Sequence, residues 1–134
     1  MTEKTHVWPL LRDGLPMVHW ARIENAVATG MADVNGCYKG QEVWIENKIF
    51  IGRRLKFRPT QPAWLMNRAK HGGNVFVLAR SGDTLFLYDA KDIIHWEHTV
   101  LADGDVSMMP TTSEVRKFPK PFDYPMIRQY MFGR

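Results

Sequence analysis

Hydrophobic and polar residues follow two different periods along the first third of the chain. Over residues 16–30, large apolar side chains recur at helical spacing between a proline and a glycine, which predicts a helix. Over 31–38 and 41–51, β-branched and aromatic residues are typical of two strands. Lys39 and Gly40 lie between these strands and predict a tight turn, so we expect a hairpin.

The pattern after this hairpin predicts a second helix, a second hairpin and a helix at the end of the chain. The predicted elements, in order, are helix 60–73, strands 74–80 and 84–89, a short helix 91–98 and a helix 124–134. The complete order, α-β-β-α-β-β-α, predicts an α/β fold in which a small mixed sheet is flanked by helices.

Length and composition narrow the class of protein. A chain of 134 residues is long enough for one hydrophobic core and too short for two. We therefore predict a single domain, 1–134, with a core over about 16–100 and a C-terminal extension over 101–134. One cysteine excludes an internal disulfide, and neither a signal peptide nor a membrane span of eighteen apolar residues is evident, so we expect an intracellular protein. A net charge of +4 permits an anionic partner such as nucleic acid.

Charged residues occupy strand positions in the first hairpin, where an unpaired buried charge costs several kcal/mol. If Lys39 and Gly40 form the turn, Asp33 lies opposite Glu46, with Cβ atoms about 5 Å apart. Lys48 shares the face of Glu46 because strand side chains alternate. Opposed carboxylates repel each other unless a cation such as Mg²⁺ lies between them. The pattern therefore predicts a metal site, and the alternative is a solvent-facing pair of Glu46 and Lys48.

A competing register would place the turn at Asn35 and Gly36, a sequence that suits a type I′ turn. This register would pair Glu46 with Asn25 and would draw part of the predicted first helix into a strand. We therefore favour the turn at Lys39 and Gly40.

Other charged residues extend the candidate site. Glu24 falls at the edge of the apolar stripe of the predicted first helix, which directs it toward the sheet more than toward bulk water. A basic cluster follows the hairpin and is formed by Arg53, Arg54, Lys56 and Arg58. Two interpretations of this cluster stay open: a solvated connector, or a phosphate-binding surface whose affinity falls as salt rises.

Taken together, these residues resemble the PD-(D/E)XK nuclease superfamily, and they are similar to its VRR-NUC branch and to archaeal Holliday junction resolvases. The ordered set that carries the likeness is Glu24, Asp33, Glu46, Lys48 and Gln61. The resemblance covers roughly residues 20–89. Ala32 stands where a proline often precedes the aspartate, and Asn47 stands in the middle of E-x-K, where an apolar residue is commoner.

The resemblance implies a restriction-endonuclease-like core with a metal site. In that family pattern, Asp33, Glu46 and the backbone carbonyl of Asn47 would hold Mg²⁺, for which Mn²⁺ would substitute. Glu24 would hold a second ion or its water. Such an ion polarises the phosphodiester and lowers the pKa of water toward neutrality.

The same resemblance implies a function and partners. Lys48 would orient the attacking water and offset charge in the transition state, and Gln61 would donate a hydrogen bond to Lys48, water or phosphate. We therefore expect a metal-dependent endonuclease acting on DNA, structure-selective for branched or Holliday junction DNA, working as a homodimer in the cytoplasm of a bacterial or virus-infected cell. The alternatives are a non-catalytic nucleic-acid-binding module on the same fold and an unrelated α/β interaction domain.

Overall fold

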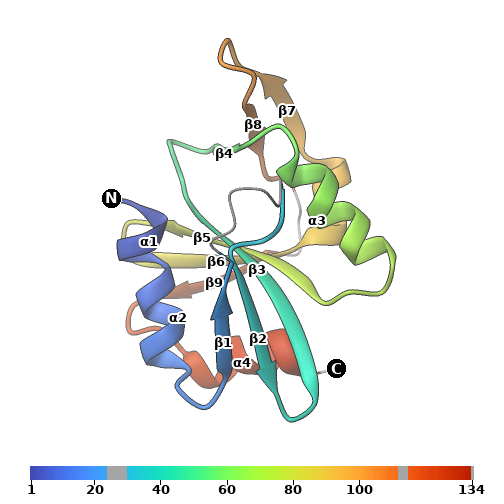
Figure 1. Ribbon diagram of the computed structural model, residues 1–134. Helices are drawn as coiled ribbons and strands as arrows, with labels where there is room; N and C mark the ends of the chain where they lie inside the picture. Colours follow the sequence, from blue (N-terminus) through green and yellow to red (C-terminus); the bar gives the residue numbers. More distant parts are fainter. Residues whose placement is uncertain (24–29, 112–114, 134) are drawn as a thin grey trace.

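The computed structural model describes residues 1–23, 30–111 and 115–133 (Figure 1). A six-stranded mixed sheet forms its centre, with the strand order β1-β2-β3-β5-β6-β9, and a second sheet has the order β4-β8-β7. The helices are α1 (Glu3–His6), α2 (Trp8–Gly14), α3 (Gln61–Lys70) and α4 (Tyr124–Phe132), with the 3₁₀ helix η1 (Ala90–His95). The main-sheet strands are β1 (His19–Arg22), β2 (Val34–Tyr38), β3 (Gln41–Ile49), β5 (Val75–Ser81), β6 (Thr84–Asp89) and β9 (Arg116–Pro119). The small-sheet strands are β4 (Leu55–Phe57), β7 (Glu97–Val100) and β8 (Val106–Met109).

The predicted first hairpin is confirmed in its turn and register, but β2 begins at Val34 and β3 ends at Ile49, so Asp33 lies just outside the ladder in which it was expected to pair with Glu46. Tyr38 pairs with Gln41 and Val34 pairs with Ile45, as a two-residue turn at Lys39 and Gly40 requires. Both turn residues have positive φ, 49° and 78°, which is the conformation of a type I′ turn. The competing register is wrong, because Asn35 lies inside β2 and pairs with Trp44.

Two hydrophobic cores lie on the two faces of the main sheet. One contains Leu11 of α2 and Ile127 of α4, packed on Ile45 and other strand residues. The other contains Leu65 of α3 and Ile93 of η1. Figure 1 shows α2 and α3 on opposite sides of the sheet. The predicted α/β class, a mixed sheet flanked by helices, is therefore confirmed.

The predicted helix over 16–30 is wrong where the structure describes it. Residues His19–Arg22 form β1, which pairs antiparallel with β2. Pairing supplies the backbone hydrogen bonds, and the Trp20 ring packs edge-on against Trp8 and Phe132 at centroid distances of 6.0 and 6.5 Å. These tertiary contacts override a weak helical spacing. The rest of that prediction, including Glu24, lies outside the described residues.

The predictions for the middle and the end of the chain hold in most parts. The helix over 60–73 corresponds to α3, the hairpin of 74–80 and 84–89 to β5 and β6, and the last helix to α4. The short helix over 91–98 is only half right, because η1 ends at His95 and β7 begins at Glu97. Helices α1 and α2 and strands β4, β8 and β9 were not predicted. None of the helices among the described residues is both long and apolar enough to cross a bilayer.

Candidate active site

The far end of β3 extends past β2 and leaves a strand edge open. The last pair of the β2–β3 ladder is Val34 with Ile45, so within residues 1–23, 30–111 and 115–133 the strand that pairs with Glu46–Ile49 is β5. Asp33 precedes β2 directly, and its Oδ2 accepts a hydrogen bond from the backbone N–H of Asn47 at 3.0 Å. The carboxylate of Asp33 thus occupies the place of a missing strand partner, and this bond fixes it beside Glu46.

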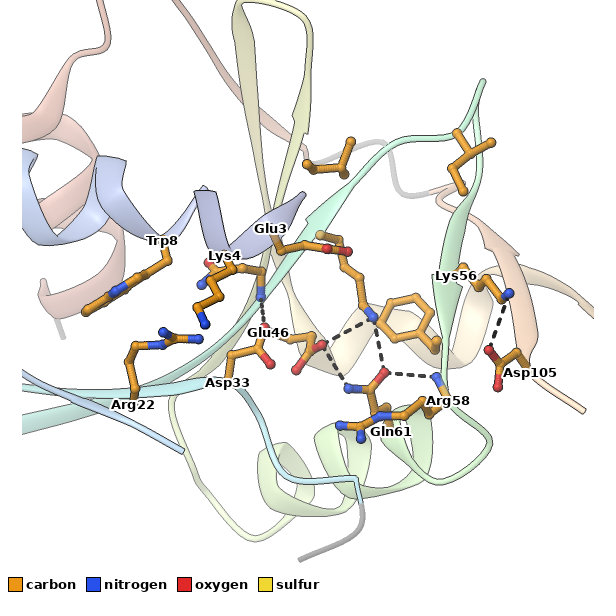
Figure 2. Close-up of a pocket in the computed structure, with 15 residues that line it drawn as sticks. Glu3, Lys4, Trp8, Arg22, Asp33, Glu46, Lys56, Arg58, Gln61 and Asp105 are labelled. Atoms are coloured by element: carbon orange, nitrogen blue, oxygen red, sulfur yellow. Dashed lines mark hydrogen bonds and ion pairs between the residues drawn. The ribbon is translucent and has the colours of Figure 1, made fainter. Parts of the chain in front are cut away.

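Glu46, Lys48 and Gln61 form a buried hydrogen-bond network on the α3 side of the sheet (Figure 2). Lys48 Nζ lies 3.2 Å from Glu46 Oε2 and donates to Gln61 Oε1 at 3.1 Å. The Gln61 amide nitrogen donates to Glu46 Oε2 at 2.9 Å. Gln61 Oε1 also accepts from the Arg58 backbone N–H at 2.9 Å. Glu46 is 1% exposed, Gln61 2% and Lys48 7%. Gln61 therefore fixes both charged side chains from the first turn of α3.

Each of the two carboxylates has one anchored oxygen and one without a partner. Within the described part of the chain, Glu46 Oε1 is buried without a hydrogen bond, and Asp33 Oδ1 makes neither a hydrogen bond nor an ion pair. A buried carboxylate oxygen without a donor, such as Glu46 Oε1, is costly unless a cation meets it. The pair therefore fits a divalent ion, which prefers hard oxygen ligands.

The described residues assemble no group of three or more His, Cys, Asp or Glu side chains around one point. A metal ion at this position would therefore depend on Asp33 and Glu46, supplemented by backbone or water oxygens. The predicted third carboxylate, Glu24, is not among the described residues, so the structure does not place it. The structure does bring Asp33, Glu46, Asn47, Lys48 and Gln61 together in one pocket of about 460 Å³.

Burial and mutual repulsion shift the titration of the carboxylate pair. Burial, followed by the charge of Asp33, raises the pKa of Glu46 to about 8, although Lys48 acts in the opposite direction. Burial also raises the pKa of Asp33, against the lowering effects of the Asn47 N–H and the Lys48 charge. Without a cation, the site therefore favours a proton on the pair at neutral pH.

This shift predicts a pH-dependent stability in metal-free protein. Because folding raises the pKa of Glu46 from 4.5, its contribution to stability is complete below pH 4.5 and is lost as the pH rises through about 8. Glu46→Gln should remove that loss. We compare the melting temperatures of Glu46→Gln and wild type in EDTA by calorimetry. The difference, variant minus wild type, should increase by roughly 10 °C between pH 5 and pH 9, which corresponds to a few kcal/mol in the free energy of unfolding.

A suitable control is Glu42→Gln, which changes an exposed glutamate on the same strand. Its difference from wild type should be nearly independent of pH. If the Glu46→Gln difference were equally flat, the raised pKa of Glu46 would be contradicted.

Cations and two further acids, Glu3 and Asp105, also line the pocket. Lys4 and Arg22 lie near Asp33, and Arg58 lies beside Gln61 (Figure 2). Glu3 of α1 also lines the pocket, and its negative charge contributes to the raised pKa of Asp33. The pocket thus combines carboxylates that could hold a metal ion with positive charges that could hold a polyanion.

Glu3 was missed because no helix was predicted before residue 16. A usable signal existed for the adjoining helix α2, since Val7, Leu11 and Leu15 recur at helical spacing and are all buried. Their burial fixes α2 against the sheet. The guanidinium of Arg80 donates to the His6 carbonyl at 2.8 Å and so fixes the end of α1, which carries Glu3.

The predicted basic cluster is divided by the fold. Arg58 and Lys56 line the pocket, and Lys56 is bound to Asp103 and Asp105 at 3.0 and 3.5 Å. Arg54 donates to Ser107 and Glu97 in the small sheet, and Arg53 does not line the pocket. Arg58 is therefore the member of the cluster best placed to meet a ligand in this pocket.

Comparison with solved structures places this arrangement on a known scaffold. The structure of Archaeoglobus fulgidus Hjc, described as a Holliday junction resolvase from an archaeal hyperthermophile, is similar with a TM-score of 0.52 over 77% of this chain and 87% of that chain, at 12% sequence identity. The chain has a restriction-endonuclease-like fold. The predicted similarity to an archaeal resolvase is thus confirmed at the level of the fold. The sequence matches no family model and no curated protein.

Proposed function

We propose that this chain is a metal-dependent endonuclease that hydrolyses DNA phosphodiester bonds in the pocket of Asp33 and Glu46. One observation carries the proposal: two carboxylates, each with an oxygen that no donor among the described residues satisfies, lie beside a buried lysine where β3 extends past β2. The nuclease-like fold supports the same chemistry, because the similar structure is that of a Holliday junction resolvase.

Asp33 and Glu46, with the backbone carbonyl of Asn47, are the groups that would hold Mg²⁺ or Mn²⁺. When bound, such an ion would supply Lewis-acid polarisation of a phosphodiester and a lowered pKa for water. Glu24 stays a predicted additional acid, and Glu3 is a second candidate for that role because it lines the same pocket.

The other side chains would position and neutralise. The Lys48 ammonium has three N–H donors, and two of them are directed to Glu46 and Gln61. The third donor could reach a water or a phosphate oxygen. Gln61 would hold Lys48 and Glu46 at a fixed separation. Lys4 and Arg58, on the two sides of the pocket, would bind the negatively charged backbone of the substrate.

The finer assignments belong to the same proposal. Branched DNA, and Holliday junctions in particular, are the proposed substrates, because the similar protein is named as a junction resolvase. A homodimer would present two such pockets to opposite strands. The VRR-NUC branch and an intracellular setting remain predictions from the sequence.

The proposal is tested with end-labelled DNA and purified wild-type protein. A four-way junction, a linear duplex of matched sequence and a single strand are each incubated with Mg²⁺, Mn²⁺ or EDTA. We expect cleavage of at least one of them with Mg²⁺ or Mn²⁺, and none in EDTA, with the junction cut fastest.

Asp33→Asn protein purified in parallel controls for contaminating nucleases. Cleavage that persists in EDTA, or that is equal in this variant, would contradict the proposal. Binding without cleavage under all metal conditions would also contradict it, and would favour a non-catalytic nucleic-acid-binding module.

A further inference from the structure

Two adjacent rows of side chains, one on β3 and one on α3, connect the candidate active site with a second cluster of side chains. On β3, Lys48, Glu46 and Trp44 share one face because strand side chains alternate. On α3, Gln61, Trp64 and Arg68 lie at positions i, i+3 and i+7, which form one stripe of a helix. Gln61 contacts Lys48 and Glu46, and Trp64 contacts Trp44, so the two rows run in opposite directions along the same interface.

The far end of these rows is an indole–arginine cluster formed by Trp44, Trp64 and Arg68. The two indole rings pack edge-on with centroids 5.5 Å apart. The Arg68 guanidinium carbon lies 5.4 Å from the Trp44 centroid and 5.0 Å from the Trp64 centroid. Cation–π contacts of this kind hold a guanidinium in one place and orientation.

The guanidinium of Arg68 has no acceptor in the described part of the chain: it makes neither a hydrogen bond nor an ion pair there. Glu42 lines the adjoining hollow, yet no ion pair joins it to Arg68. Arg68 is exposed, and two surface hollows meet at it and at the following Gly72 and Gly73. Its five N–H donors are therefore available to a ligand from solvent.

Local packing keeps this surface open. A Cβ at Gly73 would lie 2.7 Å from the Arg68 carbonyl oxygen and 2.8 Å from Arg68 Cγ, so a side chain there would collide with Arg68. The Gly73 N–H instead donates to the Arg68 carbonyl at 3.0 Å. Asn67 and His71 line the same hollow beside Arg68 and add polar groups around it.

We propose that the indole–arginine cluster is a second DNA-binding site, at which Arg68 binds a phosphate of the strand that is cut in the neighbouring pocket. A planar guanidinium with free N–H donors matches a phosphate, whose oxygens it can meet in pairs. Arg68 lies seven residues, or about 10 Å, along α3 from Gln61. That length corresponds to about three nucleotides of helical rise, so the bound phosphate would be a non-scissile one.

This inference rests on the proposed nuclease function, and it is tested by binding in EDTA, where cleavage does not interfere. A fluorescein-labelled four-way junction and the matched duplex are titrated with wild type, Arg68→Gln and Lys70→Gln, and anisotropy gives Kd. Lys70→Gln removes the same charge from an exposed position of the same helix. We expect Arg68→Gln to weaken binding by about tenfold and Lys70→Gln by less than about twofold.

The salt dependence of binding provides a readout that a purely structural role of Arg68 would not change. Loss of one phosphate contact should reduce the slope of log K against log salt by about one in Arg68→Gln and leave it unchanged in Lys70→Gln. Arg68→Lys, which keeps the charge but not the planar fork, should retain most of the slope and show intermediate affinity. Arg68→Lys also keeps the inference testable if Arg68→Gln loses thermal stability.

The possible outcomes separate this inference from the proposed function. Equal weakening by Arg68→Gln and Lys70→Gln would reveal only general charge attraction and would overturn the second site. Wild-type affinity and slope in Arg68→Gln would overturn it as well, even if metal-dependent cleavage is found. An Arg68-specific loss of affinity in a protein that does not cleave DNA would support the site and contradict the nuclease proposal.

Discussion

Asp33→Asn is expected to lower the rate of metal-dependent DNA cleavage by about 10³-fold or more. The substitution removes one of the two carboxylates that would hold the ion, and the loss of several kcal/mol of transition-state stabilisation corresponds to this factor. The fold should be kept, because an asparagine oxygen at the same position can still accept the Asn47 N–H bond. Initial rates on the labelled junction at saturating Mg²⁺ measure the effect.

A second consequence distinguishes a metal site from general damage to the fold. The Asp33 charge raises the pKa of Glu46, so Asp33→Asn should relieve that repulsion. We therefore expect the metal-free variant to be at least as stable as wild type at pH 8, while Mn²⁺ no longer raises its melting temperature. Asp83→Asn, at an exposed aspartate on the β5–β6 turn, serves as the matched control and should retain wild-type activity. Full activity in Asp33→Asn would remove Asp33 from the proposed site.

The elements that carry the site were the most predictable, because their signals are local. The β2–β3 hairpin follows from side-chain alternation and from a two-residue turn, and both fix the register without reference to the rest of the chain. That register alone brings Asp33 near Glu46 and places Lys48 on the same face. Helix α3 is likewise a local prediction, because Gly72 and Gly73 mark its end, and it brings Gln61 to the pair.

The first predicted helix was wrong because the secondary structure of this segment depends on residues that are distant in the sequence. Strand β1 pairs with β2, and Trp20 packs against Phe132 from the other end of the chain. Such contacts between residues far apart in sequence leave no local pattern. The same reason explains why β9, whose Phe118 pairs with Leu85 of β6, was not predicted within the C-terminal extension.

The wall that α1 contributes to the pocket was also beyond the sequence pattern. The helical spacing of Val7, Leu11 and Leu15 would have revealed α2, but not that Glu3 lines the same pocket as Asp33. That placement depends on the Arg80 guanidinium, which reaches the His6 carbonyl from β5. Motif order therefore identified the central residues of the site, and tertiary packing determined which side chains surround them.

Lys48→Met is expected to reduce the cleavage rate by about 10²- to 10³-fold, the range found when one preorganised donor to a transition state is removed. Lys48 Nζ lies 4.6 Å from the centroid of the Phe57 ring. Methionine fills a similar volume in this buried site, so the pocket should not collapse. The substitution has a second effect, since Lys48 lowers the pKa of Glu46 both by charge and by hydrogen bonding. Without Lys48, the pKa of Glu46 rises further, and metal binding at neutral pH weakens.

Single-turnover rates over a range of pH separate these two effects of Lys48→Met. If Lys48 only kept Glu46 ionised, saturating Mn²⁺ at pH 9 would restore the wild-type rate. If Lys48 also acts on water or phosphate, a defect of about 10²-fold will persist there, and this is the result we expect. Lys56→Met provides the control, because Lys56 lines the same pocket but is bound to Asp103 and Asp105. Equal defects in both variants would mean that positive charge in the pocket matters but that Lys48 has no special role in the reaction.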